Sequence, residues 1–164
     1  MNIKLTIEYD GTNYHGWQVQ SEGETIQSVL EKALSTFFGS PTRLIGSGRT
    51  DAGVHALGQV AHLDLADDKP LDTLRAALNY HLKPQPIAVV EAEPAPVDFH
   101  ARFSATWRRY RYRILNRRAP PAFDRGRVWH VPVPLDDQAM TDAAQVLVGR
   151  HDFNSFRSAS CQAA

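Results

Sequence analysis

The sequence lacks the features of several protein classes. Its single cysteine, Cys161, excludes a disulfide within the chain and fits a reducing, cytoplasmic location. No apolar run approaches the ~20 residues that a membrane-spanning helix needs, and the N-terminal residues lack the core of a signal peptide. With 43% hydrophobic and 22% charged residues among 164, the chain is too apolar to be disordered. These absences leave a folded protein of one domain, or of two small ones.

Metal and nucleotide motifs are also missing. The seven histidines, at positions 15, 55, 62, 81, 100, 130 and 151, show no paired spacing and have no cysteine nearby, so we expect no metal site. The turn over residues 46–53 begins like a dinucleotide-binding fingerprint, but Asp51 stands where the third glycine is required. Val54 replaces the lysine of a phosphate-binding loop. The sequence therefore predicts no metal and no nucleotide cofactor.

Lysine is absent from the second part of the chain. Residues 1–98 contain seven Lys or Arg and thirteen Asp or Glu, whereas residues 99–164 contain eleven Arg and five Asp. Nine of these arginines lie between Arg102 and Arg127, where Asp124 is the one acidic residue. Because arginine recognises phosphates and bases through a planar fork, this distribution indicates an anionic partner. The alternative is that an Arg-rich strand pairs with the acidic half of its own chain.

Hydrophobic periodicity predicts alternating strands and helices, which indicates an α/β or α+β fold. Thr25 is expected to cap a helix that ends at Gly39. Another helix is expected from Pro70 to about Leu82, and a last one over residues 136–148. The strands are predicted over residues 3–9, 42–45, 59–65, 87–93, 106–115 and 128–133.

The predicted strand over residues 106–115 carries much of the positive charge. Alternate side chains share a face, so Arg108, Tyr110 and Tyr112 are expected on one side. Arg109 and Arg111 are expected on the other side. The strand pattern alone favours core aromatics of a half-buried strand as the interpretation of Tyr110 and Tyr112.

Asp51 lies in the glycine-rich turn between two predicted strands. Aspartate in such a turn usually caps its own backbone, which is a purely structural role. The functional alternative is an exposed carboxylate on a loop held by rigid strands, with Arg49 two residues away to favour its ionised form. The turn alone favours the structural role.

Six blocks of the sequence resemble the tRNA pseudouridine synthase A family. Residues 48–56 resemble the catalytic loop of that family, and residues 9–18 its N-terminal block. Further matches follow in the family's order at residues 58–62, 98–105, 109–112 and 149–156. The resemblance therefore covers essentially the whole chain.

The resemblance implies an α+β fold, a mostly antiparallel sheet with helices on one face. It implies that uridine in the anticodon stem-loop of tRNA is isomerised to pseudouridine by a homodimer that needs no cofactor. The family's catalytic aspartate corresponds to Asp51, acting as nucleophile or base, and its active-site tyrosine to Tyr110. Arg49 is expected to hold the flipped-out uridine, and Tyr112 to serve packing. Weaker RNA contacts are expected from Arg102, Arg108, Arg109 and Arg111.

Family members are longer than this chain, so we expect a truncated form. Residues 1–105 are expected to form an N-terminal α/β domain with the catalytic loop, and residues 106–164 the incomplete start of a second α/β region. The second half of family members supplies an apolar wall and a basic partner for the aspartate, and neither can be assigned here. The alternative function is a catalytically inactive RNA-binding fragment with the same fold.

Overall fold

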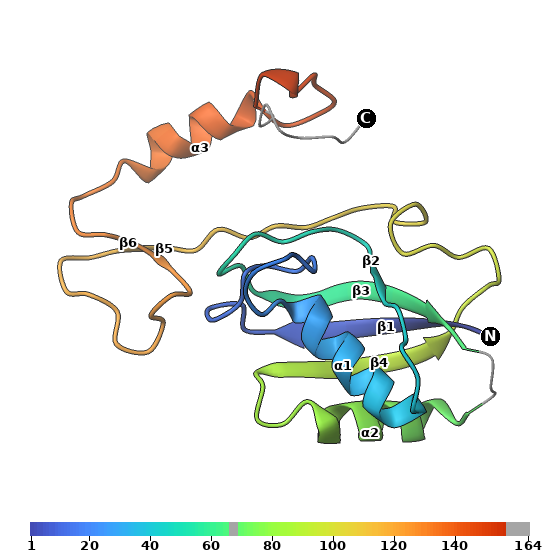
Figure 1. Ribbon diagram of the computed structural model, residues 1–164. Helices are drawn as coiled ribbons and strands as arrows, with labels where there is room; N and C mark the ends of the chain where they lie inside the picture. The colour runs from blue at the N-terminus through green and yellow to red at the C-terminus, as the bar shows by residue number, and fades with distance from the viewer. Residues whose placement is uncertain (66–68, 157–164) are drawn as a thin grey trace. The chain divides into compact units, whose positions relative to one another are not determined.

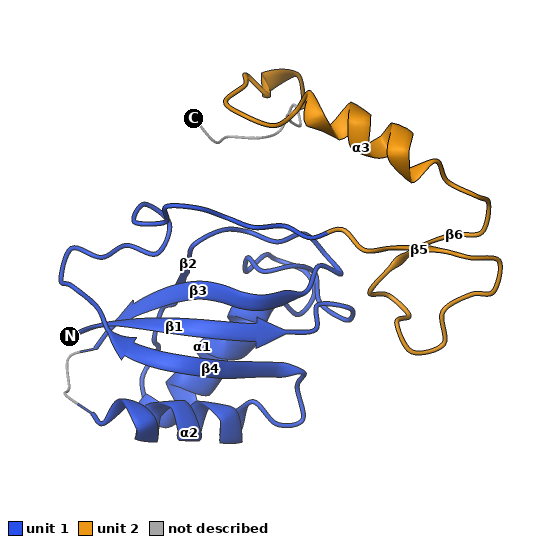
Figure 2. Cartoon of the chain, turned by 180° about the vertical axis from the view of Figure 1, so that it is seen from behind, with its two compact units in different colours: residues 1–111 blue, residues 112–164 orange. Residues whose placement is uncertain are grey.

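The computed structural model of the protein describes residues 1–65 and 69–156, so Cys161 lies outside the described residues. The chain divides into two compact units, residues 1–111 and residues 112–164, which have different colours in Figure 2. The candidate residues from Arg49 to Arg111 all belong to the first unit.

The first unit is built on a four-stranded antiparallel sheet (Figure 1). Its strands are β1 (Asn2–Tyr9), β2 (Ile45–Gly46), β3 (Ala56–Asp64) and β4 (Ile87–Pro94), in the order β2-β3-β1-β4. Strand β1 is central because it pairs with β3 on one side and with β4 on the other. Its alternating sequence buries Ile3, Leu5 and Ile7 on one face, while the residues between them are less buried.

Two helices cover the apolar face of this sheet (Figure 1). Helix α1 (Ile26–Phe38) begins after Thr25, whose side chain accepts from the backbone of Ser28, and ends at Gly39 with a φ of 70°. Helix α2 (Leu71–His81) contributes Leu74 and Leu78 to the core that α1 and the sheet share. The predicted α+β class, with a mostly antiparallel sheet and helices on one face, is confirmed.

The second unit is small and open. It contains a parallel pair of short strands, β5 (Ile114–Asn116) and β6 (Trp129–Val131), helix α3 (Asp137–Gln145) and a 3₁₀ helix at Asn154–Phe156. Asp136 caps α3, because its side chain accepts a hydrogen bond from the backbone of Ala139 at 2.9 Å. As far as this unit is described, none of its residues is buried. It therefore has no core of its own.

The predicted strand over residues 106–115 is wrong for most of its length. Residues 106–113 belong to no strand, and Ile114 and Leu115 alone enter β5. Period-2 alternation reports which side chains share a face, but a strand also needs backbone partners. Residues 106–113 have no such ladder within the described chain. They form an extended segment that is called the arm below.

Other predicted boundaries shift by a few residues. The strand expected at residues 42–45 is reduced to Ile45–Gly46, since the backbone of Leu44 bonds instead to the side chains of Gln27 and Glu31 on α1. Strand β3 begins at Ala56 rather than at residue 59. Helix α3 ends at Gln145, three residues before the predicted end.

Candidate active site

The loop between β2 and β3, residues 47–55, carries Asp51 and is anchored to β3 at its start (Figure 1). The Ser47 amide donates to the carbonyl of Val60 at 2.7 Å. The Ser47 hydroxyl donates to Oε1 of Gln59 at 2.8 Å, and Nε2 of Gln59 donates to the carbonyl of Gly48 at 2.8 Å. One glutamine side chain thus holds two consecutive residues of the loop.

Thr50, immediately before Asp51, is held through both its backbone and its side chain. Its carbonyl accepts from the amide of Trp17 at 2.9 Å, and its hydroxyl shares a 2.8 Å hydrogen bond with the phenol of Tyr9. Burial raises the pKa of the Tyr9 phenol and outweighs the hydrogen bonds with Thr50 and Gln59, which act in the opposite direction. The Tyr9 phenol is therefore a neutral anchor beneath the loop at ordinary pH.

A second loop, residues 10–17, packs against the Asp51 loop. The Gly11 amide donates to Nδ1 of His55 at 3.1 Å, at the far end of the Asp51 loop. Gly16 has a φ of 84°, and a β-carbon at this position would lie 2.6 Å from the carbonyl oxygen of Thr50. Both glycines are buried, so the two loops approach each other closely.

We expect Gly16→Ala to destabilise the protein more than Gly53→Ala. Both residues have a positive φ, of 84° and 79°, so both substitutions carry the left-handed penalty of about 1–2 kcal/mol. A β-carbon at Gly53 meets no atom within 4 Å, whereas one at Gly16 collides with the backbone of Thr50. The collision should add about 2 kcal/mol. Urea unfolding of both variants measures the difference, and equal losses would show that the loops separate easily.

Asp51 itself is exposed, and its side chain forms no hydrogen bond or ion pair with any residue that the structure describes. The same is true of Arg49. The backbone carbonyl of Asp51 accepts from the amide of Val54 at 3.2 Å, which closes the turn without the side chain. The carboxylate is therefore not used as a turn cap and is available to a ligand.

The arm reaches this loop through Arg108. Its Nη2 donates to the carbonyl of Ser47 at 2.8 Å and to that of Arg102 at 3.1 Å. Tyr110 is 63% exposed and follows Arg108 by two residues on the arm. The structure thus brings Arg108 to the loop that carries Arg49 and Asp51, while no hydrogen bond joins Tyr110 to Asp51 within residues 1–65 and 69–156.

The other arginines of the arm do not pair with the acidic half of the chain. The guanidinium of Arg109 lies 5.6 Å from the centre of the Trp107 ring, and Arg102 lies 5.6 Å from that of Phe103. In the described part of the chain, Arg102, Arg108, Arg109 and Arg111 form no ion pair with a carboxylate. The alternative of internal charge pairing is therefore not observed for these four residues.

Sequence analysis missed Tyr9 and Gln59 as residues of this site. Each of them appeared only as a residue of a predicted strand and of a family block, with no role at the site. Their contacts with the loop depend on the register of β1 against β3, in which Ile7 faces Gln59. The signal in the sequence that could have indicated this contact was Gln59, which follows a glycine-rich turn and whose amide carries both a donor and an acceptor.

His62 connects β3 to the segment that leads into the arm. This buried ring accepts a hydrogen bond at Nδ1 from the amide of Ala101 at 3.2 Å, and its centre lies 4.8 Å from that of His100. Burial lowers the pKa of His62 and His100 lowers it further, while Asp64 and a backbone hydrogen bond with Ile45 act in the opposite direction. The folded protein therefore favours the neutral ring.

We expect stability to fall as the pH drops below about 6.5, in part through His62. The unfolded chain takes up a proton at this residue before the folded chain does, so protons favour unfolding. His62→Asn, whose amide oxygen can replace Nδ1 as acceptor, should weaken this pH dependence. Urea unfolding at about pH 7.5 and about pH 5.5 measures it. The exposed His81→Asn is the control, and equal slopes for both variants would contradict the prediction.

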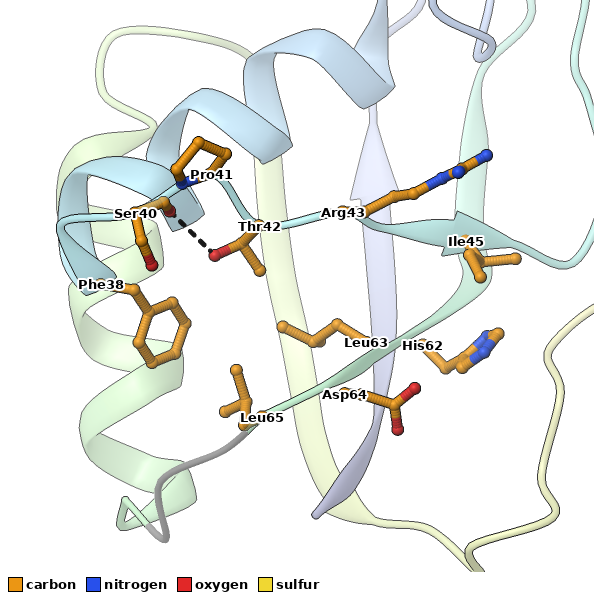
Figure 3. A pocket seen from close by; sticks show the side chains of 10 residues that line it. All are labelled: Phe38, Ser40, Pro41, Thr42, Arg43, Ile45, His62, Leu63, Asp64 and Leu65. Carbon is orange, nitrogen blue, oxygen red and sulfur yellow. Dashed lines mark hydrogen bonds between the residues drawn. The ribbon is translucent and has the colours of Figure 1, made fainter.

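A hollow of about 410 Å³ lies elsewhere, near the end of α1 and the last residues of β3 (Figure 3). Phe38, Arg43 and Leu65 are among its lining residues, and Figure 3 shows the hydrogen bond of Thr42 to the Ser40 carbonyl at its rim. None of the residues that line it belongs to the Asp51 loop or to the arm. It is therefore separate from the candidate site.

The described residues contain no group of three or more His, Cys, Asp or Glu that could hold a metal ion. No helix among them is long and apolar enough to cross a membrane.

Comparison with known proteins points to one family. A family model described as tRNA pseudouridine synthase matches residues 5–104. A protein named tRNA pseudouridine synthase A from Rhodospirillum rubrum is 62% identical over 163 residues, which are 99% of this chain and 59% of that protein. Proteins of the same name from Paramagnetospirillum magneticum and Methylobacterium radiotolerans are 58% and 60% identical over 160 residues, 98% of this chain and 62% and 63% of theirs. The chain thus spans about three fifths of the length of these curated relatives.

Proposed function

Because the chain belongs to the tRNA pseudouridine synthase family, we propose that it carries the catalytic loop of an enzyme that isomerises uridine to pseudouridine in the anticodon stem-loop of tRNA. The observation that carries the proposal is the state of Asp51. Its side chain is exposed and unpaired among the described residues, while the backbone before it is held through Ser47, Gly48 and Thr50. Such a carboxylate is oriented by the fold and available to a substrate.

The proposed reaction needs no oxidant or reductant. The bond between C1′ of the ribose and N1 of uracil breaks, a bond between C1′ and C5 forms, and the proton lost from C5 is balanced by one gained at N1. Uracil is a poor leaving group, so its departure requires help from a nucleophile or a base. The roles open to Asp51 are attack on the sugar, attack on the ring, or removal of a sugar proton. Each of them uses an ionised carboxylate.

The target base must leave the RNA stack before Asp51 can reach its sugar. Tyr110 is proposed to stack on the extruded uracil and to offer its hydroxyl for hydrogen bonding or proton transfer. Its exposure supports this role, and so does the hydrogen bond that ties Arg108, two residues before it, to the Asp51 loop. Arg49 is proposed to hold the flipped-out nucleotide, since it is an exposed residue of the same loop.

Arg102, Arg109 and Arg111 are proposed to contact RNA phosphates, whereas Arg108, which is bonded differently, is assigned another role below. Their guanidinium groups are exposed and form no ion pair with the described carboxylates. Phosphate contacts release counterions, so binding should weaken steeply as salt increases.

The whole enzyme is proposed to need more than this chain. Residues 1–105 would supply the domain with the catalytic loop, and residues 106–164 the start of a second α/β region. The lack of any buried residue in the described part of the second unit supports a role as part of a larger fold. A homodimer in which tRNA contacts two copies is part of the same proposal.

A chimera tests the proposed activity. In it, the 164 residues replace the matching region of the Rhodospirillum rubrum relative, so that the remaining two fifths or so of that protein complete the fold. Anticodon-arm RNA with tritium at C5 of uridine should release the label, because C5 forms the new bond to the sugar. If the chimera binds the RNA tightly but releases no tritium, the catalytically inactive RNA-binding alternative holds for this chain.

A further inference from the structure

One arginine of the arm is bonded differently from its neighbours. Nη2 of Arg108 donates to two backbone carbonyls, those of Ser47 and Arg102, which lie 61 and 6 residues away in the sequence. A β-carbon at Gly48 would lie 3.5 Å from Nε of Arg108, so the guanidinium group also lies beside the second residue of the Asp51 loop. The guanidinium of Arg109 lies by the Trp107 ring instead. Arg108 therefore joins three segments: the Asp51 loop, the turn at Arg102 and the arm.

The two carbonyls that Arg108 binds occupy the N–H donors of Nη2, which are then not available to a phosphate. Hydrogen bonds from a charged donor are about twice as strong as those between neutral groups. A phosphate contact through Nη2 would have to replace both carbonyls and leave them without their donor. The two carbonyls use the donors of Nη2 alone among the five N–H donors of the guanidinium. The geometry therefore shows a structural use of this group, and the chimera experiment below separates it from a phosphate contact through Nε or Nη1.

The position of Arg108 links the two proposed catalytic groups. The Ser47 carbonyl lies at the start of the loop that presents Asp51, and Tyr110 follows Arg108 by two residues on the arm. Gln59 and Tyr9 hold the loop from the sheet side. Arg108 holds it from the arm.

We propose that Arg108 is a positioning residue that fixes the arm, and with it Tyr110, against the loop that presents Asp51. The proposal rests on the function proposed above, which assigns Asp51 and Tyr110 to the same reaction. Without Arg108, the arm and the loop should move independently. Amide exchange in the loop should then become faster, and the reaction should become slower.

Amide hydrogen exchange on the 164-residue chain tests the contact without any need for activity. The Ser47 amide bonds to Val60 and the Trp17 amide bonds to Thr50, so both report on the loop. Arg108→Met removes the donors and should speed exchange at these amides about tenfold, because a hydrogen bond from a charged group is lost. Arg108→Lys should restore most of the protection, and Arg109→Met should leave exchange unchanged. Unchanged exchange in Arg108→Met would overturn the proposal, whether or not the chimera is active.

The chimera then separates positioning from phosphate contact. Arg108→Met should lower the single-turnover rate at saturating RNA by about 10- to 100-fold, as expected when reacting groups are misplaced. Its RNA affinity should stay within about twofold, and its salt slope should not change. A phosphate contact would instead weaken binding and reduce the salt slope by about one, which is the result expected for Arg109→Met. That pattern in Arg108→Met, with a normal rate at saturation, would also overturn the proposal.

Discussion

Asp51→Asn is expected to lower tritium release by the chimera by a factor on the order of 10⁴ or more, as loss of a nucleophile or base does in other enzymes. The substitution keeps the shape of the side chain and removes its charge and basicity. Stability should hardly change, because the carboxylate forms no hydrogen bond or ion pair with the described residues, so nothing is left unpaired. RNA affinity should stay the same or rise slightly, since a negative charge near phosphates is removed.

Asp72→Asn is the matched control. Its carboxylate is 90% exposed on α2 and pairs with Arg75 at 3.1 Å, a surface contact of little energetic weight. Unfolding curves and RNA affinity should be alike for the two variants and the parent, and the rate should fall in Asp51→Asn alone. Substantial tritium release by Asp51→Asn would remove Asp51 from the chemistry and leave its exposed carboxylate unexplained.

The sheet and helices of the first unit could be predicted because local chemistry determines them. Alternation along residues 3–9 requires one buried face, and Thr25 and Gly39 provide a side-chain cap and a left-handed residue at the two ends of α1. These signals lie within a few residues of the structure that they predict. The same holds for Asp136, which caps α3.

The arm could not be predicted in this way. Alternation over residues 106–115 is real, but the backbone partners that would make it a strand must come from elsewhere. The early start of β3 has a similar cause, since Ala56 becomes a strand residue by pairing with Tyr9. Pairing between distant segments is not encoded in the local pattern.

The candidate site shows the same division. Asp51, Arg49 and Tyr110 could be named from their motifs, but the reason that Asp51 is free could not. Its side chain is not needed to cap the turn, because other side chains hold the loop. Gln59 bonds to Ser47 and Gly48, and Tyr9 bonds to Thr50. Those contacts exist only in one register of β1 and β3 and with a close approach at Gly16. The sequence thus indicated candidate groups, and the fold determines how they are presented.

Tyr110→Phe is expected to lower the single-turnover rate of the chimera by about 100-fold, while Tyr112→Phe changes it by less than about threefold. The two tyrosines belong to the same short motif and differ in surroundings. Tyr110 follows Arg108, which bonds to the Asp51 loop, by two residues, whereas Tyr112 begins the second unit. The packing role predicted for Tyr112 is wrong, because this residue is 91% exposed. A hydroxyl that takes part in proton transfer is worth about 10²–10⁴ in rate, and the conservative change removes it alone.

A second substitution separates the hydroxyl from the ring of Tyr110. Phenylalanine keeps the flat face on which an extruded uracil can stack, so Tyr110→Phe should retain RNA affinity while the rate falls. Tyr110→Leu also removes the stacking surface, which is worth about 1–3 kcal/mol per base, and should weaken binding of the flipped nucleotide as well. If Tyr110→Phe and Tyr112→Phe lowered the rate equally, neither hydroxyl would be specific to the reaction. Tyr110 would then be an exposed aromatic of the arm, and the group that contacts the uracil would have to be sought among the remaining residues near Asp51.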